Sequence, residues 1–449
     1  MKRAYPFLLL IILCFTICLF GCSNQSEKAS AQQINYTERT FTVVEKLVNN
    51  KISDFYSYFD SNMKKQVTLT DVQKVWGDIL MTYGVFDYYK TDITIVSQDG
   101  YQIADVPCFF KNGSVTLRIT FNNKGEISGF FITDNTTASN SLQLAHDMEI
   151  TFGEEPYIIT GSLTLPEGEG PFPAVILVQG SGPSDRNEQI GPNLPFMDLA
   201  EQLSAQGIAV LRYDKRTYLH SNKMAALEDL TVQEETIEDA VAAAAFLQTL
   251  ETINSEQIYI AGHSLGGYLM PRIAAQTPDA AGYIMLAAPA RPMEDLMLEQ
   301  TEYILSLEKE LDQAAKDKLL SQTRTMVNNI KSLTPESDLT AAELGNAPAS
   351  YWLDLQGYNP ITEAQMIHQP LLILQGGRDY QVTKTDYEMW ESAFSTYDDV
   401  HFRFYDNLNH LFMTGTGKST PSEYQQKGTV DTAVSTDIAN FVLDHAAIQ

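Results

Sequence analysis

The chain has 449 residues, of which 44% are hydrophobic and 19% are charged, a composition typical of a folded globular protein. At about 150 residues per domain, this length predicts two or three domains. Asp and Glu number 57 against 30 Lys and Arg, so the formal net charge is −27. Because such a surface repels phosphate groups, the composition argues against a protein that binds nucleic acid.

Residues 1–21 have the features of an export signal, which is removed rather than folded. Lys2 and Arg3 precede an apolar run from Phe7 to Phe20 that is too short for a comfortable transmembrane helix. The run ends in Leu-Phe-Gly-Cys22, which resembles the lipobox of bacterial lipoproteins and implies that Cys22 is lipidated. We therefore expect an exported protein that is lipid-anchored to the outer face of the bacterial cell membrane. The alternative is an uncleaved apolar anchor with an incidental cysteine, and it also places the folded part of the protein outside the cytoplasm.

Cysteine usage excludes two classes of site. Apart from the cysteines of the first 22 residues, the chain has only Cys108, so neither a disulfide framework nor a cysteine-rich metal site can form. We expect no metal and no cofactor. Cys108 lies between Val106-Pro107 and Phe109-Phe110, an apolar setting that predicts a buried thiol.

A small α+β domain is predicted over residues 35–135, after a polar tether at residues 22–34. Apolar residues recur at helical intervals up to about Thr82, and alternating segments with Asp-Gly, Asn-Gly and Lys-Gly breaks follow. We expect a curved four-stranded antiparallel sheet with strands at Tyr88–Val96, Tyr101–Phe110, Ser114–Phe121 and Ile127–Thr133. This arrangement resembles the nuclear-transport-factor-like cone fold, and a spacer role is favoured over ligand binding because no polar cluster is visible.

The second domain is predicted over residues 149–449, after a polar linker at residues 136–148. Here short apolar strands alternate with helices, which indicates an α/β fold with a mostly parallel sheet covered on both faces. Active residues should lie at the carboxyl ends of such strands. The predicted strands are Ile158–Leu165, Ala174–Val178, Gly207–Arg212, Gln257–Ala261, Gly282–Ala288, Pro370–Leu374 and Val400–Tyr405.

The candidate nucleophile is Ser264, in Gly262-His263-Ser264-Leu265-Gly266, between a predicted strand and a helix-like segment. Gly-x-Ser-x-Gly needs its glycines because the nucleophile occupies a sharp turn where flanking Cβ atoms would clash. A serine hydroxyl also needs an imidazole base, and the base needs an acid that fixes its tautomer.

Asp379 and His410 are the predicted acid and base, because each follows a predicted strand and the order Ser, Asp, His suits this architecture. Asp406, in the loop of His410, is the rival acid. The backbone N–H groups of Leu265 and Ser181 are the predicted oxyanion donors, since both lie in loops where such donors are needed.

From about Glu149 onwards the chain resembles an α/β-hydrolase, closest to the dienelactone-hydrolase-like and prolyl-peptidase-like branch of exported esterases. The resemblance implies hydrolysis of short-chain carboxylic esters. Gln179 replaces the usual histidine of the oxyanion loop, which leaves open how that loop is held. The resemblance is carried by Gly180-Ser181-Gly182-Pro183 with Asp185-Arg186, Arg212-Tyr213-Asp214-Lys215-Arg216, the Ser264 turn, Gly376 to Val382, and Asn409-His410. For Asp185, Arg186, Asp214 and Arg216, ion pairing behind the oxyanion loop is the favoured role.

Residues 289–368 form an insertion between two successive strands, with amphipathic helical patterns that suggest a cap over the site. Tyr351, Trp352 and Leu353 are candidates for lining the substrate pocket. The triad serves a carboxylesterase acting on a small ester, but a peptidase or peptide deacylase uses the same residues. A catalytically inactive surface-binding protein, or an N-terminal domain that binds cell-wall or peptide material, remains as a different class of function.

Overall fold

The computed structural model describes residues 34–91, 93–98, 101–111, 113–134, 144, 146–225, 227–309 and 311–446. The predicted export signal, Cys22, nearly all of the tether and most of the linker lie outside these residues. The chain divides into two compact units, one containing Gly21–Gln143 and the other Leu144–Gln449. Within the described ranges, no helix is both long and apolar enough to cross a membrane.

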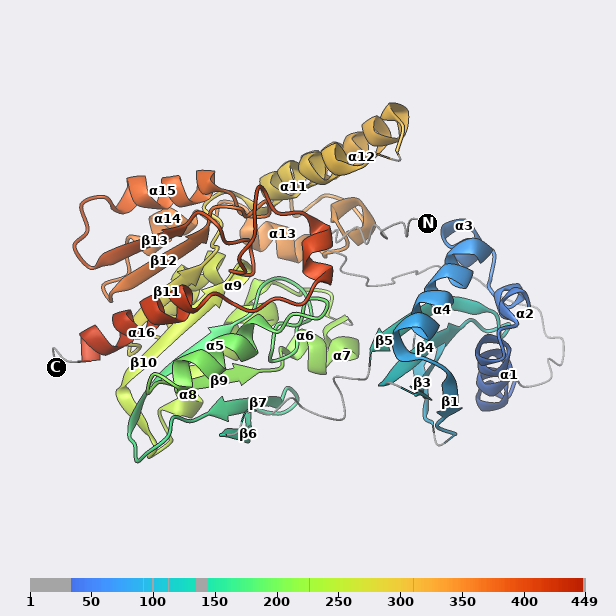
Figure 1. Ribbon diagram of the computed structural model, residues 1–449. Helices are drawn as coiled ribbons and strands as arrows, with labels where there is room; N and C mark the ends of the chain where they lie inside the picture. Colours follow the sequence, from blue (N-terminus) through green and yellow to red (C-terminus); the bar gives the residue numbers. More distant parts are fainter. Residues whose placement is uncertain are drawn as a thin grey trace. The chain divides into compact units, whose positions relative to one another are not determined.

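The N-terminal unit is an antiparallel sheet packed against helices (Figure 1). The strand order is β1-β3-β4-β5, and β2 also pairs with β3. The helices are α1 (Tyr36–Val48), α2 (Ile52–Ser57), α3 (Met63–Gln66) and α4 (Leu69–Tyr83), and the strands are β1 (Phe86–Tyr89), β2 (Ile95–Gln98), β3 (Tyr101–Phe110), β4 (Gly113–Phe121) and β5 (Ile127–Asp134).

The expectation of four strands is wrong, because the segment predicted as one strand at Tyr88–Val96 forms two. β1 pairs with the end of β3 around Cys108, and β2 pairs with its beginning around Ala104. Ten residues make β3 long enough to hold two short strands one after the other along the same edge.

Helices α1 and α4 of this unit begin at capping residues. The Asn35 side chain accepts the Glu38 N–H at the start of α1, and Thr68 and Asp71 form a reciprocal capping box at the start of α4. Cys108 is fully buried in the core beneath these helices, as predicted, and burial raises the pKa of its thiol to about 12. The unit's core includes Val43, Val44, Leu47, Phe55, Trp76, Val106, Leu117 and Ile119.

The C-terminal unit is built on an eight-stranded sheet in the order β13-β12-β11-β10-β8-β9-β7-β6. The six strands from β8 to β13 are parallel to one another, and β7 and β6 run antiparallel at one edge. The strands are β6 (Asp147–Phe152), β7 (Ile159–Thr164), β8 (Phe172–Val178), β9 (Ala209–Tyr213), β10 (Ile253–His263), β11 (Gly282–Leu286), β12 (Leu371–Gly376) and β13 (Val400–Tyr405). The predicted mostly parallel α/β sheet is therefore confirmed.

Helices cover both faces of this sheet (Figure 1). On one face lie α5 (Pro195–Ser204) and α16 (Thr432–Ala446), which contribute Leu199 and Ile438 to a shared apolar core. The other face carries α8 (Glu238–Leu247), α10 (Met270–Gln276) and α15 (Lys384–Phe394) over a second core. Every residue of β11 and β12 is buried, as expected for strands covered on both sides.

The insertion between β11 and β12 is helical. Figure 1 shows α12 extending away from the sheet beside α11, while α13 and α14 lie closer to it. The insertion contains α11 (Met293–Leu307), α12 (Gln313–Lys331), the 3-10 helix η2 (Ala341–Leu344), α13 (Ala349–Leu355) and α14 (Pro360–Ala364). Tyr351 and Trp352, the candidates for lining a substrate pocket, are both buried, and the Trp352 Nε1–H donates to the Leu344 carbonyl oxygen.

Candidate active site

Ser264 occupies a strained turn between β10 and the short helix α9 (Leu265–Tyr268). Its φ of +52° and ψ of −113° lie in a region that residues with a Cβ rarely adopt. A Cβ on Gly262 would clash with the backbone of Gly266, so the motif's glycines are required by packing. Ser264 itself stays partly exposed although both of its neighbours are buried.

His410 and Asp379 form a buried pair at the same end of the sheet. The His410 Nδ1 atom lies 2.6 Å from Asp379 Oδ2, and each side chain is at most 4% exposed. Asp379 Oδ1 accepts the N–H groups of Gln381 and Val382 at 2.7 and 3.1 Å. The carboxylate is therefore held in one orientation by donors on both of its oxygens.

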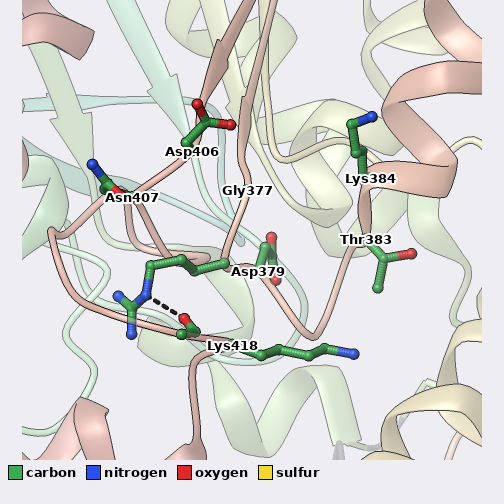
Figure 2. Close-up of a pocket in the computed structure, with 9 residues that line it drawn as sticks. Gly377, Asp379, Thr383, Lys384, Asp406, Asn407 and Lys418 are labelled. Carbon is green, nitrogen blue, oxygen red and sulfur yellow. Dashed lines mark hydrogen bonds between the residues drawn. The ribbon is translucent and has the colours of Figure 1, made fainter.

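Asp406, the rival acid, does not bond to His410. It is exposed and helps to line an open cavity of about 360 Å³, with Asn407 beside it and Thr383 and Lys384 on the opposite wall (Figure 2). Sequence proximity to the histidine thus misleads, because the loop directs Asp406 towards solvent.

Ser264 and His410 lie close together through their neighbours. The His263 Nε2 atom is 2.9 Å from the His410 carbonyl oxygen, which joins the serine turn to the histidine loop. Both side chains are among the described residues, and Ser264 Oγ forms no hydrogen bond with the His410 ring. Such contacts are often long without substrate and shorten in the reacting complex.

The loop Gly180-Ser181-Gly182 lies against the candidate nucleophile, because a Cβ on Gly180 would stand 3.3 Å from the Ser264 Cβ. The Gly180 N–H donates to Glu188 Oε1 at 2.6 Å, and the Gly182 N–H donates to Glu235 Oε1 at 2.9 Å. By contrast, the N–H groups of Ser181 and Leu265 have no acceptor among the residues that the structure describes. The two predicted oxyanion donors therefore both remain available.

Gln179 holds the start of this loop where the resemblance led us to expect histidine. It is fully buried, and its Nε2–H donates to the carbonyl oxygen of Tyr213. A side-chain amide thus ties the loop to the end of β9, and its backbone donors do not depend on a histidine.

The predicted ion pairs behind the loop are present, and Glu149, Glu238 and Asp239 are partners that the sequence did not identify. Arg186 contacts Asp214 and Glu149, and Arg216 contacts Asp239 and Glu238. Asp185 instead accepts the backbone N–H of Gln189. Arg186 thus joins the loop to β6 and to the residue after β9, and Arg216 joins the segment after β9 to α8. None of these contacts involves Ser264.

His263 is a site residue that sequence reasoning treated only as the variable position of the turn. Its ring is buried, and its Nδ1 atom lies 3.0 Å from Glu188 Oε1. Burial opposes the charged imidazolium, but the neighbouring Glu188 carboxylate outweighs it and raises the pKa of His263. Glu188 thereby connects the Gly180 N–H to His263, and His263 connects to His410.

Glu235 is the second site residue without a sequence signal. It lies in the π-helix η1 (Gln233–Ile237), 53 positions after the Gly182 whose N–H it accepts, and it pairs with the buried Lys215 at 2.9 Å. π-Helical turns frequently mark functional sites. Only Lys215, in the Asp-Lys-Arg block, belonged to a segment that the sequence had singled out.

Comparison with known proteins identifies two families along the chain and one curated relative. Residues 194–416 match the family described as serine aminopeptidase, S33, and residues 41–130 match a family described as a protein of unknown function. Esterase EstD of Thermotoga maritima is 34% identical over 411 residues, which are 91% of this chain and 95% of that protein.

Solved structures with similar folds include Est1E from Butyrivibrio proteoclasticus, at 19% identity and a TM-score of 0.43, covering 67% of this chain and 99% of that chain. Proline iminopeptidase from Mycobacterium smegmatis has 15% identity and a TM-score of 0.44, covering 67% and 100%. On the strength of the match along almost the whole of Esterase EstD, the chain belongs to the same α/β-hydrolase family and is a serine hydrolase of the esterase type.

Proposed function

We propose that the protein hydrolyses carboxylic esters of short acyl chains through a Ser264–His410–Asp379 triad and an acyl-enzyme. The observation that carries this proposal is the buried 2.6 Å contact between His410 Nδ1 and Asp379, next to the strained Ser264 turn. This contact places the proton on Nδ1 and leaves Nε2 free to act as the base.

In the proposed reaction, Ser264 Oγ attacks the ester carbonyl carbon while His410 takes the hydroxyl proton. The negative charge on the carbonyl oxygen is stabilised by the N–H groups of Ser181 and Leu265. The alkoxide then leaves with the proton from His410. Water, deprotonated by His410, attacks the acyl-enzyme and releases the acid and the free serine.

The test is the initial rate on p-nitrophenyl esters from two to twelve carbons, with wild type and Ser264→Ala compared. A rate that depends on Ser264 and peaks at short chains supports the proposal. Labelling of Ser264 by a fluorophosphonate without turnover of any ester would instead favour peptides. That second candidate is favoured by the family description of residues 194–416 as a serine aminopeptidase.

We further propose that the protein is exported and held at the outer face of the cell membrane by a lipid on Cys22. The support is the sequence of residues 1–22, with its basic start, apolar run and Gly21-Cys22 end. Incorporation of radiolabelled palmitate into wild type but not into Cys22→Ala is the expected result. Equal labelling of both proteins would refute the anchor.

For the N-terminal unit we propose a nuclear-transport-factor-like fold that acts as a spacer between the anchor and the hydrolase. Helices packed against one antiparallel sheet support this proposal. Deletion of residues 35–135 should leave the rate on small esters unchanged. A changed rate from a folded deletion variant would assign this unit a part in the reaction.

A further inference from the structure

Glu235 is a fully buried carboxylate whose two oxygens have different partners. Oε1 accepts the Gly182 N–H and pairs with Lys215 Nζ, both at 2.9 Å. Oε2 accepts the hydroxyl of Tyr351 at 2.7 Å. Because Tyr351 lies on α13 of the insertion, this single side chain joins the oxyanion loop to the insertion.

Lys215 fixes the direction of the peptide that contains the Ser181 N–H. Its Nζ donates to the Gly180 carbonyl oxygen at 2.8 Å and to the Gly182 carbonyl oxygen at 3.2 Å. The Gly180 carbonyl and the Ser181 N–H belong to one planar trans peptide, so they point in opposite directions. Holding that oxygen on the buried ammonium therefore aims the Ser181 N–H away from Lys215.

Tyr351 is held so that its hydroxyl remains a donor to Glu235. The residue is 4% exposed, and burial together with the carboxylate raises the pKa of Tyr351 above its ordinary value. The adjacent Ser350 Oγ donates to the Leu230 carbonyl oxygen at 2.9 Å, which docks α13 on the segment before η1. The start of α13 is thus attached at two points to the segment that carries Glu235.

We propose that Tyr351, Glu235 and Lys215 are positioning residues for the oxyanion hole, so that the helical insertion is needed for catalysis and does not only cap the site. This inference rests on the proposed esterase reaction. It assigns no contact with substrate to the three residues, because the contacts that carry it are with the backbone of the loop and with one another.

The two roles of the insertion predict different kinetics. A cap that only restricts substrate size changes KM and the preferred acyl chain length. A positioning contact changes kcat by the same factor for every chain length, because each ester develops the same oxyanion.

The experiment compares wild type, Tyr351→Phe and the matched control Tyr283→Phe on esters of two to eight carbons. Tyr283 is also fully buried, and its hydroxyl donates to the Thr277 carbonyl oxygen at 2.5 Å, with no contact to the oxyanion loop. We expect Tyr351→Phe to lower kcat roughly tenfold at unchanged KM, a fraction of the roughly 100- to 1,000-fold loss when an oxyanion donor is removed. Tyr283→Phe should keep the wild-type kcat.

A trifluoromethyl ketone, which forms an oxyanion adduct with serine, provides a readout that a loss of stability would not change. Its inhibition constant, determined on folded protein, should rise in Tyr351→Phe by the same factor as kcat falls. Glu235→Gln, which has nearly the same shape, provides a second variant and should lower kcat further.

A kcat within twofold of wild type in folded Tyr351→Phe or in folded Glu235→Gln would overturn the inference. So would a loss confined to the longer esters, since it would reduce the insertion to a cap. Absence of Ser264-dependent turnover in wild type itself would instead refute the proposed function, and the two failures are therefore distinguishable.

Discussion

Replacing Asp379 by Asn tests the proposed triad at the position where the structure is most restrictive. Asp379 Oδ1 accepts two backbone N–H groups, from Gln381 and Val382, and Oδ2 faces His410 Nδ1 and the Gln375 amide. An asparagine has only one acceptor atom for these two sides. The backbone donors cannot adapt, so the carboxamide oxygen should take the Oδ1 position and its NH₂ group should face His410.

An NH₂ group next to Nδ1 reverses the tautomer of His410. Nδ1 must then be the acceptor, so the proton moves to Nε2, and the nitrogen proposed as the base can no longer take the Ser264 proton. The equivalent change in a serine protease lowers kcat by about 10⁴, or roughly 5.5 kcal/mol of transition-state stabilisation. We expect a loss of the same order because the pair here is similarly short and buried.

The assay is kcat on a two-carbon p-nitrophenyl ester at pH 7 to 8, with unfolding midpoints to verify that the variants fold. Asp406→Asn is the matched control, since this carboxylate is also in a loop after a strand but is exposed. It should retain the wild-type rate. If Asp379→Asn kept more than a tenth of the activity, or if Asp406→Asn lost it, the assignment of the acid would be wrong.

Three further predictions concern stability and reactivity. Because the pKa of His263 is raised in the folded state, its pairing with Glu188 stabilises the protein below the ordinary histidine pKa, and this stabilisation is lost as pH rises through the raised value. The unfolding midpoint should therefore fall less between pH 6 and pH 9 in His263→Gln than in wild type. An equal fall in the two proteins would contradict the pairing. Gly415→Ala should destabilise the protein by about 1–3 kcal/mol, because the new Cβ would overlap the buried Arg378 guanidinium. An unchanged midpoint of urea unfolding would show that the guanidinium can move aside. Iodoacetamide at pH 8 should not modify Cys108 until the protein is denatured, because this thiol is buried and burial raises its pKa to about 12. Rapid modification of the native protein would show that the thiol lies outside the core.

Local sequence patterns were sufficient to place the candidate residues at a turn or at the end of a strand. Ser264, Asp379 and His410 each follow a predicted strand of a parallel sheet, so topology alone brings them to one edge. The available N–H groups of Ser181 and Leu265 were predicted in the same way.

Contacts between distant segments could not be predicted. Glu235 is an ordinary glutamate in the sequence, and only the fold brings it to Gly182 and Tyr351. His263 likewise gained a role only when Glu188 was found beside it. The edge strand β6 was not predicted, although Met148, Ile150 and Phe152 alternate with polar residues in the period-2 pattern of a strand.

The π-helical turn at Gln233–Ile237 makes the site sensitive to the number of residues in this segment. An α-helix turns by about 100° per residue, so removing one residue here would restore α-helical geometry and rotate one flank of the turn against the other. The flank in α8 is fixed, because Ala240, Ala243 and Leu247 are fully buried against the sheet. The segment that contains Glu235 would therefore rotate instead, which would move the Glu235 carboxylate away from Gly182. A single-residue deletion in this stretch would change the reaction more than most substitutions, even though every residue in contact with substrate remained in place.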